Sequence, residues 1–367
     1  MLDSKRLLDR FLRYIACDSE SGDEERFCRL IMGELEALGL TVTRDNAGEM
    51  CASNGWNVYA SLPGEGEPIL FCAHMDTVKP GKNIKPIIGE DGIIRSSGDT
   101  ILGADDKCGI SAVLEALTII REQGLPHRPV EVLFTICEET GLHGSRNADY
   151  SRMHSKQAVV FDSGRVDYLL NQAPAHIVLH IRVAGKSAHA GVAPEQGIHA
   201  LKAAALAVAD ITCGRADELT VMNVSNFMSP GKTNVVPAEA TFDMEIRCFD
   251  EERLAFWVDS VKRTLEKACA QVGASYTVEM DRHNSALYVP EDSPLMVRIC
   301  QACRKLGLEP APKRAFGGND SVWLFANGIH AVNVGAGMGN VHSVDETLTV
   351  AYLEQAVQLI LDLTGPD

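Results

Sequence analysis

FCAHMDTV, residues 71–78, is the stretch that decides the fold: an apolar run leads to a histidine, and an aspartate follows two positions later. The apolar run 69–73 predicts a buried strand that ends at His74. Side chains alternate along a strand, so His74 and Asp76 are expected to point to the same side. The pair is either a satisfied polar contact at a strand end or a metal-ligating histidine whose second ring nitrogen is held by a carboxylate. The rest of the chain has to decide between these interpretations.

Around this strand, the first and last parts of the chain alternate between helical and extended patterns. Continuous apolar strands between helices predict an α/β fold with a mainly parallel central sheet flanked by helices. The expected helices are residues 3–15, 23–38, 108–123, 293–306 and 346–363, and the expected strands are 40–44, 57–61, 69–74, 130–137, 158–162 and the segment HAVNVGAG.

The pattern changes at about residue 174, where strands with polar alternation replace the continuous apolar runs. The order strand–helix–strand–strand–helix–strand predicts an inserted α+β domain of the ferredoxin-like, split βαβ type. We therefore expect a discontinuous first domain, residues 1–173 and 286–367, and an inserted domain, residues 174–285. The length of 367 residues agrees with two domains, because one core usually divides beyond roughly 250–300 residues.

Composition argues against several classes of protein. Hydrophobic residues make up 46% of the chain and charged residues 23%, as in ordinary globular proteins. The net charge of −16 argues against a nucleic acid or an anionic membrane as partner. No apolar run approaches the ~20 residues that span a bilayer, and the N-terminal segment lacks the apolar core and cleavage site of a signal peptide.

The cysteines predict a reducing compartment, the cytoplasm. There are eleven, an odd number, and most are scattered in apolar runs. Cys300 and Cys303 form a CxxC by spacing. They lie in a helical pattern without the strand–turn context of a redox motif, so we interpret them as buried helix cysteines.

Further acidic residues flank predicted strands and helices. Asp105 and Asp106 in GADDKCG open a helix, Glu138 and Glu139 follow the strand VEVLFTIC, and Asp162 ends the strand AVVFD. Each has a plain alternative: the aspartates can cap the helix, and the glutamates can be a solvated pair. Ligands of open α/β sheets bind beyond the carboxyl ends of strands, so the shared location favours a functional site.

Counting ligands predicts two metal ions. His342 lies in a glycine-rich loop, and such a histidine taken alone is usually an ordinary surface residue. One ion would take His74, Asp105 and Asp162, and a second would take Asp105, Glu139 and His342. Nitrogen and oxygen ligands with open positions suit a catalytic pair of zinc ions about 3.5–4 Å apart, with Mn²⁺ or Co²⁺ as substitutes.

Five motifs, HMDTV, GADDKCG, CEETGLHGS, FDSG and GNVHSVDE, occur in the order seen in the co-catalytic zinc peptidases of the aminoacylase and carboxypeptidase G type. The chain resembles this family over essentially its whole length, with the closest likeness to peptidase T and peptidase T-like proteins. The resemblance implies Asp105 rather than Asp106 as the shared ligand, because the bridging residue of the family stands two positions before the lysine, here Lys107. It also implies that Asp76 orients the histidine two positions before it and that Glu138 is the general base.

The resemblance also assigns residues in the inserted domain, which looks like the lid and dimerisation domain of the family. His189 would stabilise the tetrahedral oxyanion, in its own subunit or in a neighbouring one. Asn234 and Arg247 would contact a substrate carboxylate, since arginine binds carboxylates through two parallel hydrogen bonds. The alternatives are a turn histidine and a strand arginine in an ordinary salt bridge.

A glycine-rich loop, FGGNDSVWL at residues 316–324, resembles the family segment that approaches the substrate backbone. Gly317 and Gly318 would supply unusual φ angles or room, and Asn319 would contact the substrate. The alternative is that Asn319 and Asp320 only cap the following helix.

These expectations combine into a cytoplasmic, homodimeric di-zinc metallopeptidase that hydrolyses small peptides as a peptidase T-like aminopeptidase, or tripeptidase. The alternative within the family is an N-acyl-amino-acid amidase or a carboxypeptidase. A metal-binding scaffold without catalysis is disfavoured because the base, Glu138, is present. A magnesium–phosphate protein is disfavoured because no P-loop follows the first strand.

Overall fold

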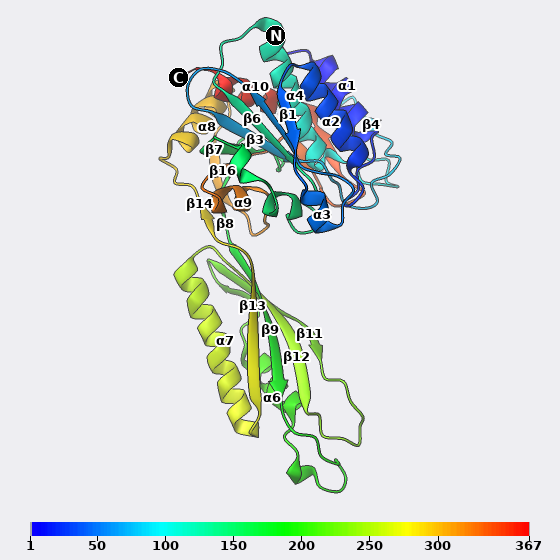
Figure 1. Ribbon diagram of the computed structural model, residues 1–367, viewed down its shortest axis with the longest axis vertical. Helices are drawn as coiled ribbons and strands as arrows, with labels where there is room; N and C mark the ends of the chain where they lie inside the picture. The colour runs from blue at the N-terminus through cyan, green and yellow to red at the C-terminus, as the bar shows by residue number, and fades with distance from the viewer. Residues whose placement is uncertain (1, 367) are drawn as a thin grey trace. The chain divides into compact units, whose positions relative to one another are not determined.

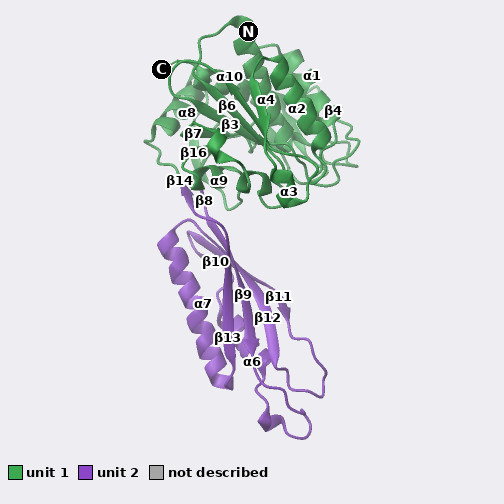
Figure 2. Ribbon diagram, viewed as in Figure 1, with its two compact units in different colours: residues 1–171, 288–367 green, residues 172–287 purple. Residues whose placement is uncertain are grey.

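The expected helix and strand patterns assemble into two compact units, residues 1–171 with 288–367 and residues 172–287 (Figures 1 and 2). The computed structural model describes residues 2–366. The first unit contains a sheet in the order β1-β2-β6-β3-β7-β16-β8-β14, with β15 paired to β8. Its strands are β1 (Thr41–Arg44), β2 (Val58–Leu62), β3 (Ile69–His74), β6 (Val130–Thr135), β7 (Gln157–Val160), β8 (Tyr168–Ala173), β14 (Leu287–Tyr288), β15 (Ala311–Arg314) and β16 (His330–Asn333).

The centre of this sheet is parallel. Strand β3 pairs in parallel with β6 on one side and β7 on the other, and β7 pairs in parallel with β16. Every residue of β3 and β6 is buried, as their continuous apolar sequences require for strands covered on both faces. The predicted α/β fold is confirmed, and the carboxyl ends of β3, β6 and β7 meet at one edge of the sheet.

Helix α4 (Ala104–Gln123) is the central helix of this unit. It packs against β3 and is contacted in turn by α1 (Ser4–Ile15) and α10 (Val350–Thr364). Nearly all of its residues are buried, so its start is fixed firmly beside the end of β3. The other helices are α2 (Glu25–Ala37), α3 (Ala47–Cys51), α5 (His143–Arg146), α8 (Pro294–Lys305), α9 (Ser321–Ala326) and the 3₁₀ turn η1 (Tyr150–Arg152).

A second, small sheet in this unit was not predicted from the sequence. Its order is β17-β18-β5-β4, with β4 (Ile87–Ile88), β5 (Ile93–Arg95), β17 (Met338–Gly339) and β18 (Thr347–Thr349). These strands are too short for a side-chain alternation to be recognisable in the sequence. The loop between β17 and β18 carries His342, so this sheet positions one of the candidate ligands.

The second unit has the predicted order of elements around an antiparallel sheet, β10-β11-β12-β9-β13. Alternate residues of β12 are buried against helices α6 and α7, which form one apolar core with the sheet. The short edge strand β10 and the turn η2 were not predicted. The elements are β9 (Ala175–Ala184), η2 (Pro194–Gln196), α6 (Ala200–Asp210), β10 (Gly214–Asp217), β11 (Thr220–Met228), β12 (Glu239–Cys248), α7 (Glu251–Val272) and β13 (Ser275–Asn284).

The start of α7 gives a test of the local structure. The Asp250 carboxylate accepts a 2.7 Å hydrogen bond from the Arg253 N–H and caps the helix. Replacing Asp250 with alanine should cost about 1 kcal/mol and speed amide hydrogen exchange in the first turn of α7 about five-fold. Asp250→Ser, which keeps a capping oxygen, should stay near the wild-type rate. Equal exchange in the wild type and the alanine variant would show that the cap contributes nothing.

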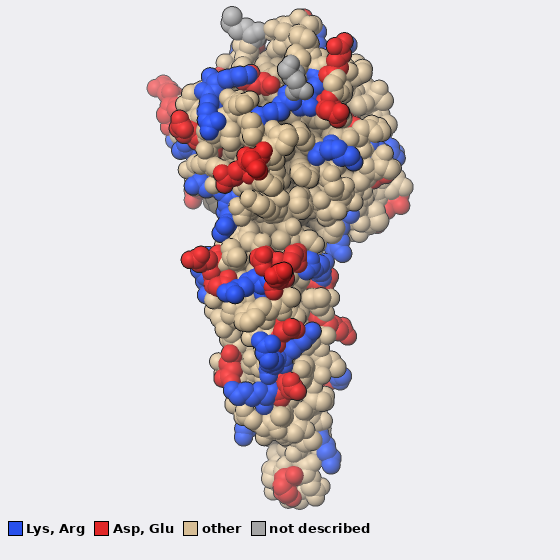
Figure 3. Space-filling view, turned by 90° about the vertical axis from the view of Figure 1, so that its left-hand side faces the viewer, with Lys and Arg blue, Asp and Glu red and all other residues tan. Residues whose placement is uncertain are grey.

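Acidic and basic side chains are mixed on the molecular surface. On the face drawn in Figure 3, basic and acidic side chains are interspersed rather than gathered into one patch. Among the described residues, no helix combines the length and apolarity needed to cross a membrane.

Cys300 and Cys303, the two cysteines of the CxxC spacing, both lie in helix α8, and neither is in a disulfide.

Candidate functional site

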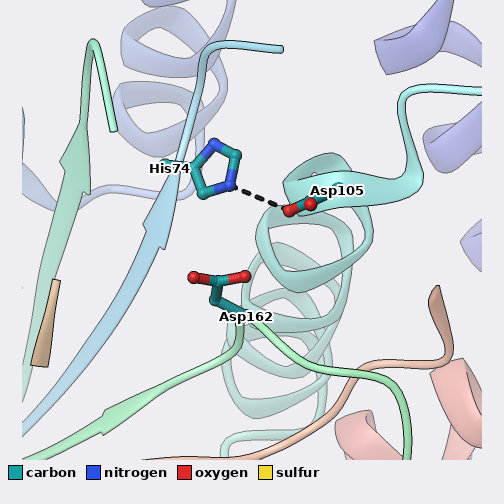
Figure 4. A group of neighbouring side chains, drawn as sticks. All are labelled: His74, Asp105 and Asp162. Atoms are coloured by element: carbon teal, nitrogen blue, oxygen red, sulfur yellow. Dashed lines mark hydrogen bonds and ion pairs between the residues drawn. The ribbon is translucent and has the colours of Figure 1, made fainter. Parts of the chain in front are cut away.

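Three side chains from separate segments meet at the carboxyl edge of the parallel strands (Figure 4). His74 is the last residue of β3, Asp105 lies at the start of α4, and Asp162 follows β7. Each offers one ligand atom within 4.8 Å of the others. The Nε2 atom of His74 is 2.9 Å from Oδ1 of Asp105. The geometry is that of a small cluster of nitrogen and oxygen donors.

A second cluster shares Asp105 with the first. Asp105, Glu139 and His342 also offer ligand atoms within 4.8 Å of one another. Nε2 of His342 lies 3.2 Å from Oδ2 of Asp105 and 2.8 Å from Oε2 of Glu139. Each oxygen of Asp105 therefore faces one histidine, Oδ1 toward His74 and Oδ2 toward His342.

The second ring nitrogen of His74 is held mainly by the main chain. Nδ1 lies 2.9 Å from the carbonyl oxygen of Asp76 and 3.5 Å from its carboxylate. A proton on Nδ1 donated to that carbonyl leaves Nε2 with a free lone pair. Asp76 was predicted to orient His74 through its carboxylate, whereas the closer contact comes from its carbonyl.

The Asp76 carboxylate instead fixes the segment after β6. It accepts hydrogen bonds from the Glu138 N–H at 2.9 Å and the Glu139 N–H at 3.2 Å, and from the Ser21 hydroxyl at 2.7 Å. Asp76 thus connects the end of β3 to both glutamates.

Burial and crowding of carboxylates dominate the electrostatics. Burial, followed by the charge of Asp162, raises the pKa of Glu138 well above its ordinary value. Burial, followed by the charge of Asp105, raises the pKa of Asp162 in the same way. Burial also raises the pKa of Glu139 to about 7, and the hydrogen bond with Asp105 raises the pKa of His342 to about 9. Divalent cations would relieve this repulsion.

The donor set fits metal ions of the zinc type. Oε1 of Glu139 is buried and has no hydrogen-bond partner, although its Oε2 faces His342. Two imidazoles and three carboxylates are ligands that Zn²⁺, Mn²⁺ and Co²⁺ accept, and no thiolate is among them. The described residues therefore suit two ions that share Asp105.

The candidate residues of the inserted domain lie in the second unit. Nδ1 of the exposed His189 accepts a hydrogen bond from the Gly191 N–H at 3.2 Å. The Asn234 carbonyl accepts one from the Ala190 N–H at 3.0 Å, so the two segments run side by side. Arg247, on β12, donates from Nε to Oε1 of Glu245 at 2.7 Å. These contacts match the plainer alternatives, and substrate contacts by these residues stay predictions.

The glycine-rich loop differs from one expectation. Gly317 and Gly318 are exposed, and neither has φ in the left-handed range. The prediction of unusual φ angles is wrong. A Cβ at residue 317 would meet no atom within 4 Å, so the packing of the described residues does not require glycine there, and room for a substrate stays a prediction. The Asn319 side-chain oxygen accepts a hydrogen bond from the Ser321 N–H at 3.0 Å at the start of α9, as the helix-capping alternative predicts.

Two buried acids near the site, Asp320 and Glu346, were not predicted from the sequence to support it. Asp320 does not cap α9. Its Oδ2 atom accepts a 2.5 Å hydrogen bond from the Thr135 hydroxyl at the end of β6. Glu346 is 1% exposed and contacts the start of α4. Both lie within quoted motifs, Asp320 in FGGNDSVWL and Glu346 in GNVHSVDE, but their hydrogen-bond partners lie far away in the sequence.

Comparisons with known proteins show a family match and similar chains. A family model described as Peptidase family M20/M25/M40 matches residues 70–364. The chain is similar to peptidase T of Escherichia fergusonii, with 26% identity over 97% of each chain.

Two solved structures are similar over nearly their whole length. One is a tripeptidase from Staphylococcus aureus, with a TM-score of 0.92, 30% identity and coverage of 99% of this chain and 98% of that one. The other is the aminopeptidase PepT from Bacillus cereus, with a TM-score of 0.93, 31% identity and the same coverage.

Proposed function

The chain belongs to the peptidase family M20/M25/M40 and is a peptidase, and from this premise we propose that it is a two-metal aminopeptidase that hydrolyses tripeptides. The observation that carries the proposal is the placement of Asp105, whose two carboxylate oxygens each face a different histidine. The similarity to a tripeptidase and to an aminopeptidase supports the substrate class.

Each ion would have its own ligands besides the shared Asp105. His74 and Asp162 would complete the first site, and Glu139 and His342 the second. Zinc ions bound there would polarise the scissile carbonyl and lower the pKa of a water molecule to near neutrality.

Glu138 is the residue we assign to proton transfer. Its side chain is buried beside Asp162, and its backbone is fixed by Asp76. A Glu138 carboxylate oxygen would take the proton from the attacking water and deliver it to the nitrogen of the leaving amine. His189 of the inserted domain is the proposed donor to the oxyanion.

The proposal extends to the assembly and the compartment of the protein. Strand β13 is an edge of its sheet, most of its residues are exposed, and Met280 is 56% exposed. An open edge is suited to pairing with a second copy, so we propose a homodimer through the inserted domain. We propose the cytoplasm as the compartment, because the eleven cysteines are all free, as in a reducing environment.

A peptide panel tests the proposed substrate. A free tripeptide should be hydrolysed, and its C-terminal amide should be hydrolysed similarly. Its N-acetylated form should react on the order of 100-fold more slowly, because a pocket that binds a free amine would be left with unpaired polar groups. Chelation should abolish the activity, and Zn²⁺, Co²⁺ or Mn²⁺ should restore it. Faster hydrolysis of the N-acetylated peptide would favour the amidase or carboxypeptidase alternative.

A further inference from the structure

Glu346 connects the two loops that carry Asp105 and His342. Its Oε2 atom accepts hydrogen bonds from the N–H groups of Leu102 at 2.7 Å and Gly103 at 2.8 Å. Its Oε1 atom accepts a third from the N–H of Asp105 itself, at 3.0 Å. Both oxygens are thus used on the backbone of the segment that begins α4.

This contact holds the backbone that leads into α4. The residue before α4 is Gly103, which has no side chain to cap with. Asp105 lies within the first turn, where an aspartate would normally accept from free N–H groups, but its oxygens face the two histidines instead. Its φ of −77° and ψ of 106° also depart from helical values. Glu346, from a distant part of the chain, accepts from the Asp105 N–H instead, while the Asp106 carboxylate accepts from the Gly109 N–H further into the helix.

The backbone of Glu346 belongs to the loop that carries His342. Glu346 follows His342 by four residues, and its N–H donates to the Ser343 carbonyl at 3.2 Å. The Ser96 N–H donates to the Glu346 carbonyl at 3.1 Å, which ties the loop to β5. Glu346 is therefore anchored by its backbone on the His342 side and by its side chain on the Asp105 side.

We propose that Glu346 is a positioning residue that sets Asp105 against His342, so that the second metal ion finds its ligands already in place. The inference rests on the proposed two-metal function. It assigns to Glu346 no contact with metal or substrate, only control of the geometry between two ligands.

Glu346→Gln is the informative substitution because the two carboxylate oxygens of Glu346 accept from different N–H groups. A glutamine can place its oxygen where Oε2 lies, so that it still accepts from the N–H groups of Leu102 and Gly103. Its NH₂ group would then face the Asp105 N–H, donor against donor, and that bond is lost. The loop should stay attached while Asp105 loses its support.

Glu131→Gln is the matched control. Glu131 is 7% exposed, lies near the start of β6, and accepts hydrogen bonds from the backbone N–H groups of His154 and Ser155 at 2.9 Å. It differs from Glu346 in having no bond to a segment with a candidate ligand. A purely structural loss should therefore be similar in the two variants.

The experiment is titration of the chelator-stripped full chain with Co²⁺, followed by its visible absorption and by calorimetry. Wild type should bind two ions. Glu346→Gln should bind the second ion roughly 10- to 100-fold more weakly with an altered Co²⁺ spectrum, whereas Glu131→Gln should match the wild type. Glu346→Asp, which keeps the charge but reaches less far, should fall between, and it serves as the test if the glutamine variant does not fold.

Two results would overturn the proposal: second-ion affinities within three-fold of wild type in the Glu346 variants, or an equal weakening in Glu131→Gln. A wild-type chain that binds fewer than two ions would instead refute the two-metal function on which the proposal rests. The wild-type titration therefore distinguishes failure of the function from failure of the role of Glu346.

Discussion

Replacing Glu138 with glutamine is expected to lower kcat about 10²- to 10⁴-fold while both metal ions remain bound. Glutamine has nearly the same shape but cannot accept a proton from water. The backbone N–H of residue 138 should still donate to Asp76, so the site should keep its form. Tripeptide hydrolysis and metal content, measured on the same preparation, check this result.

Glu139→Gln is the matched control for this prediction. The two glutamates are adjacent, and both backbone N–H groups donate to Asp76. Glu139 belongs to a ligand cluster and Glu138 does not, so the Glu139 variant should lose metal along with activity. Undiminished hydrolysis by Glu138→Gln would remove this residue from the role of base.

Asp105→Asn is expected to weaken binding of both ions on the order of 100-fold or more. Substituting a residue that only hydrogen-bonds to a metal ligand already lowers metal affinity roughly 10- to 100-fold. Asp105 would itself be a ligand, and both ions would share it. An asparagine has one oxygen, so its NH₂ group would face either His74 or His342. At metal concentrations below saturation, the rate of tripeptide hydrolysis should fall by at least the same factor as the metal affinity.

Asp106→Asn provides the comparison. Asp106 is adjacent and fully buried, yet its oxygens accept hydrogen bonds from the backbone of His74 and Gly109, both at 3.3 Å. It belongs to neither ligand cluster. Metal analysis by mass spectrometry should find two ions in this variant and fewer in Asp105→Asn. The reverse result would mean that the shared ligand is Asp106.

The α/β fold and the clustering of the segments that carry the candidate ligands could be predicted from the apolar pattern of the strands. Continuous apolar runs such as β3 and β6 indicate strands buried on both faces, and the carboxyl ends of parallel strands share one edge of the sheet. His74 and Asp162 could therefore be expected together from the strand pattern, whereas Asp105 was preferred to Asp106 only because of the family resemblance. His342 was harder to place, because its position depends on a small sheet whose strands are two or three residues long.

Contacts made by loops could not be predicted in the same way. No periodicity indicates that the Glu346 side chain bonds to Gly103, 243 residues away, or that His74 is held by a carbonyl rather than a carboxylate. Such partners are set by tertiary packing after the strands are in place. Asn319 differs from these residues, because its oxygen accepts from the Ser321 N–H only two residues away, a local contact that the capping alternative predicted.

The most direct test of the account is anomalous X-ray diffraction at the zinc edge from crystals of the zinc-loaded protein. The account predicts two peaks roughly 3.5–4 Å apart, one beside His74 and Asp162 and the other beside Glu139 and His342, with Asp105 between them. A single peak, or peaks away from Asp105, would contradict it.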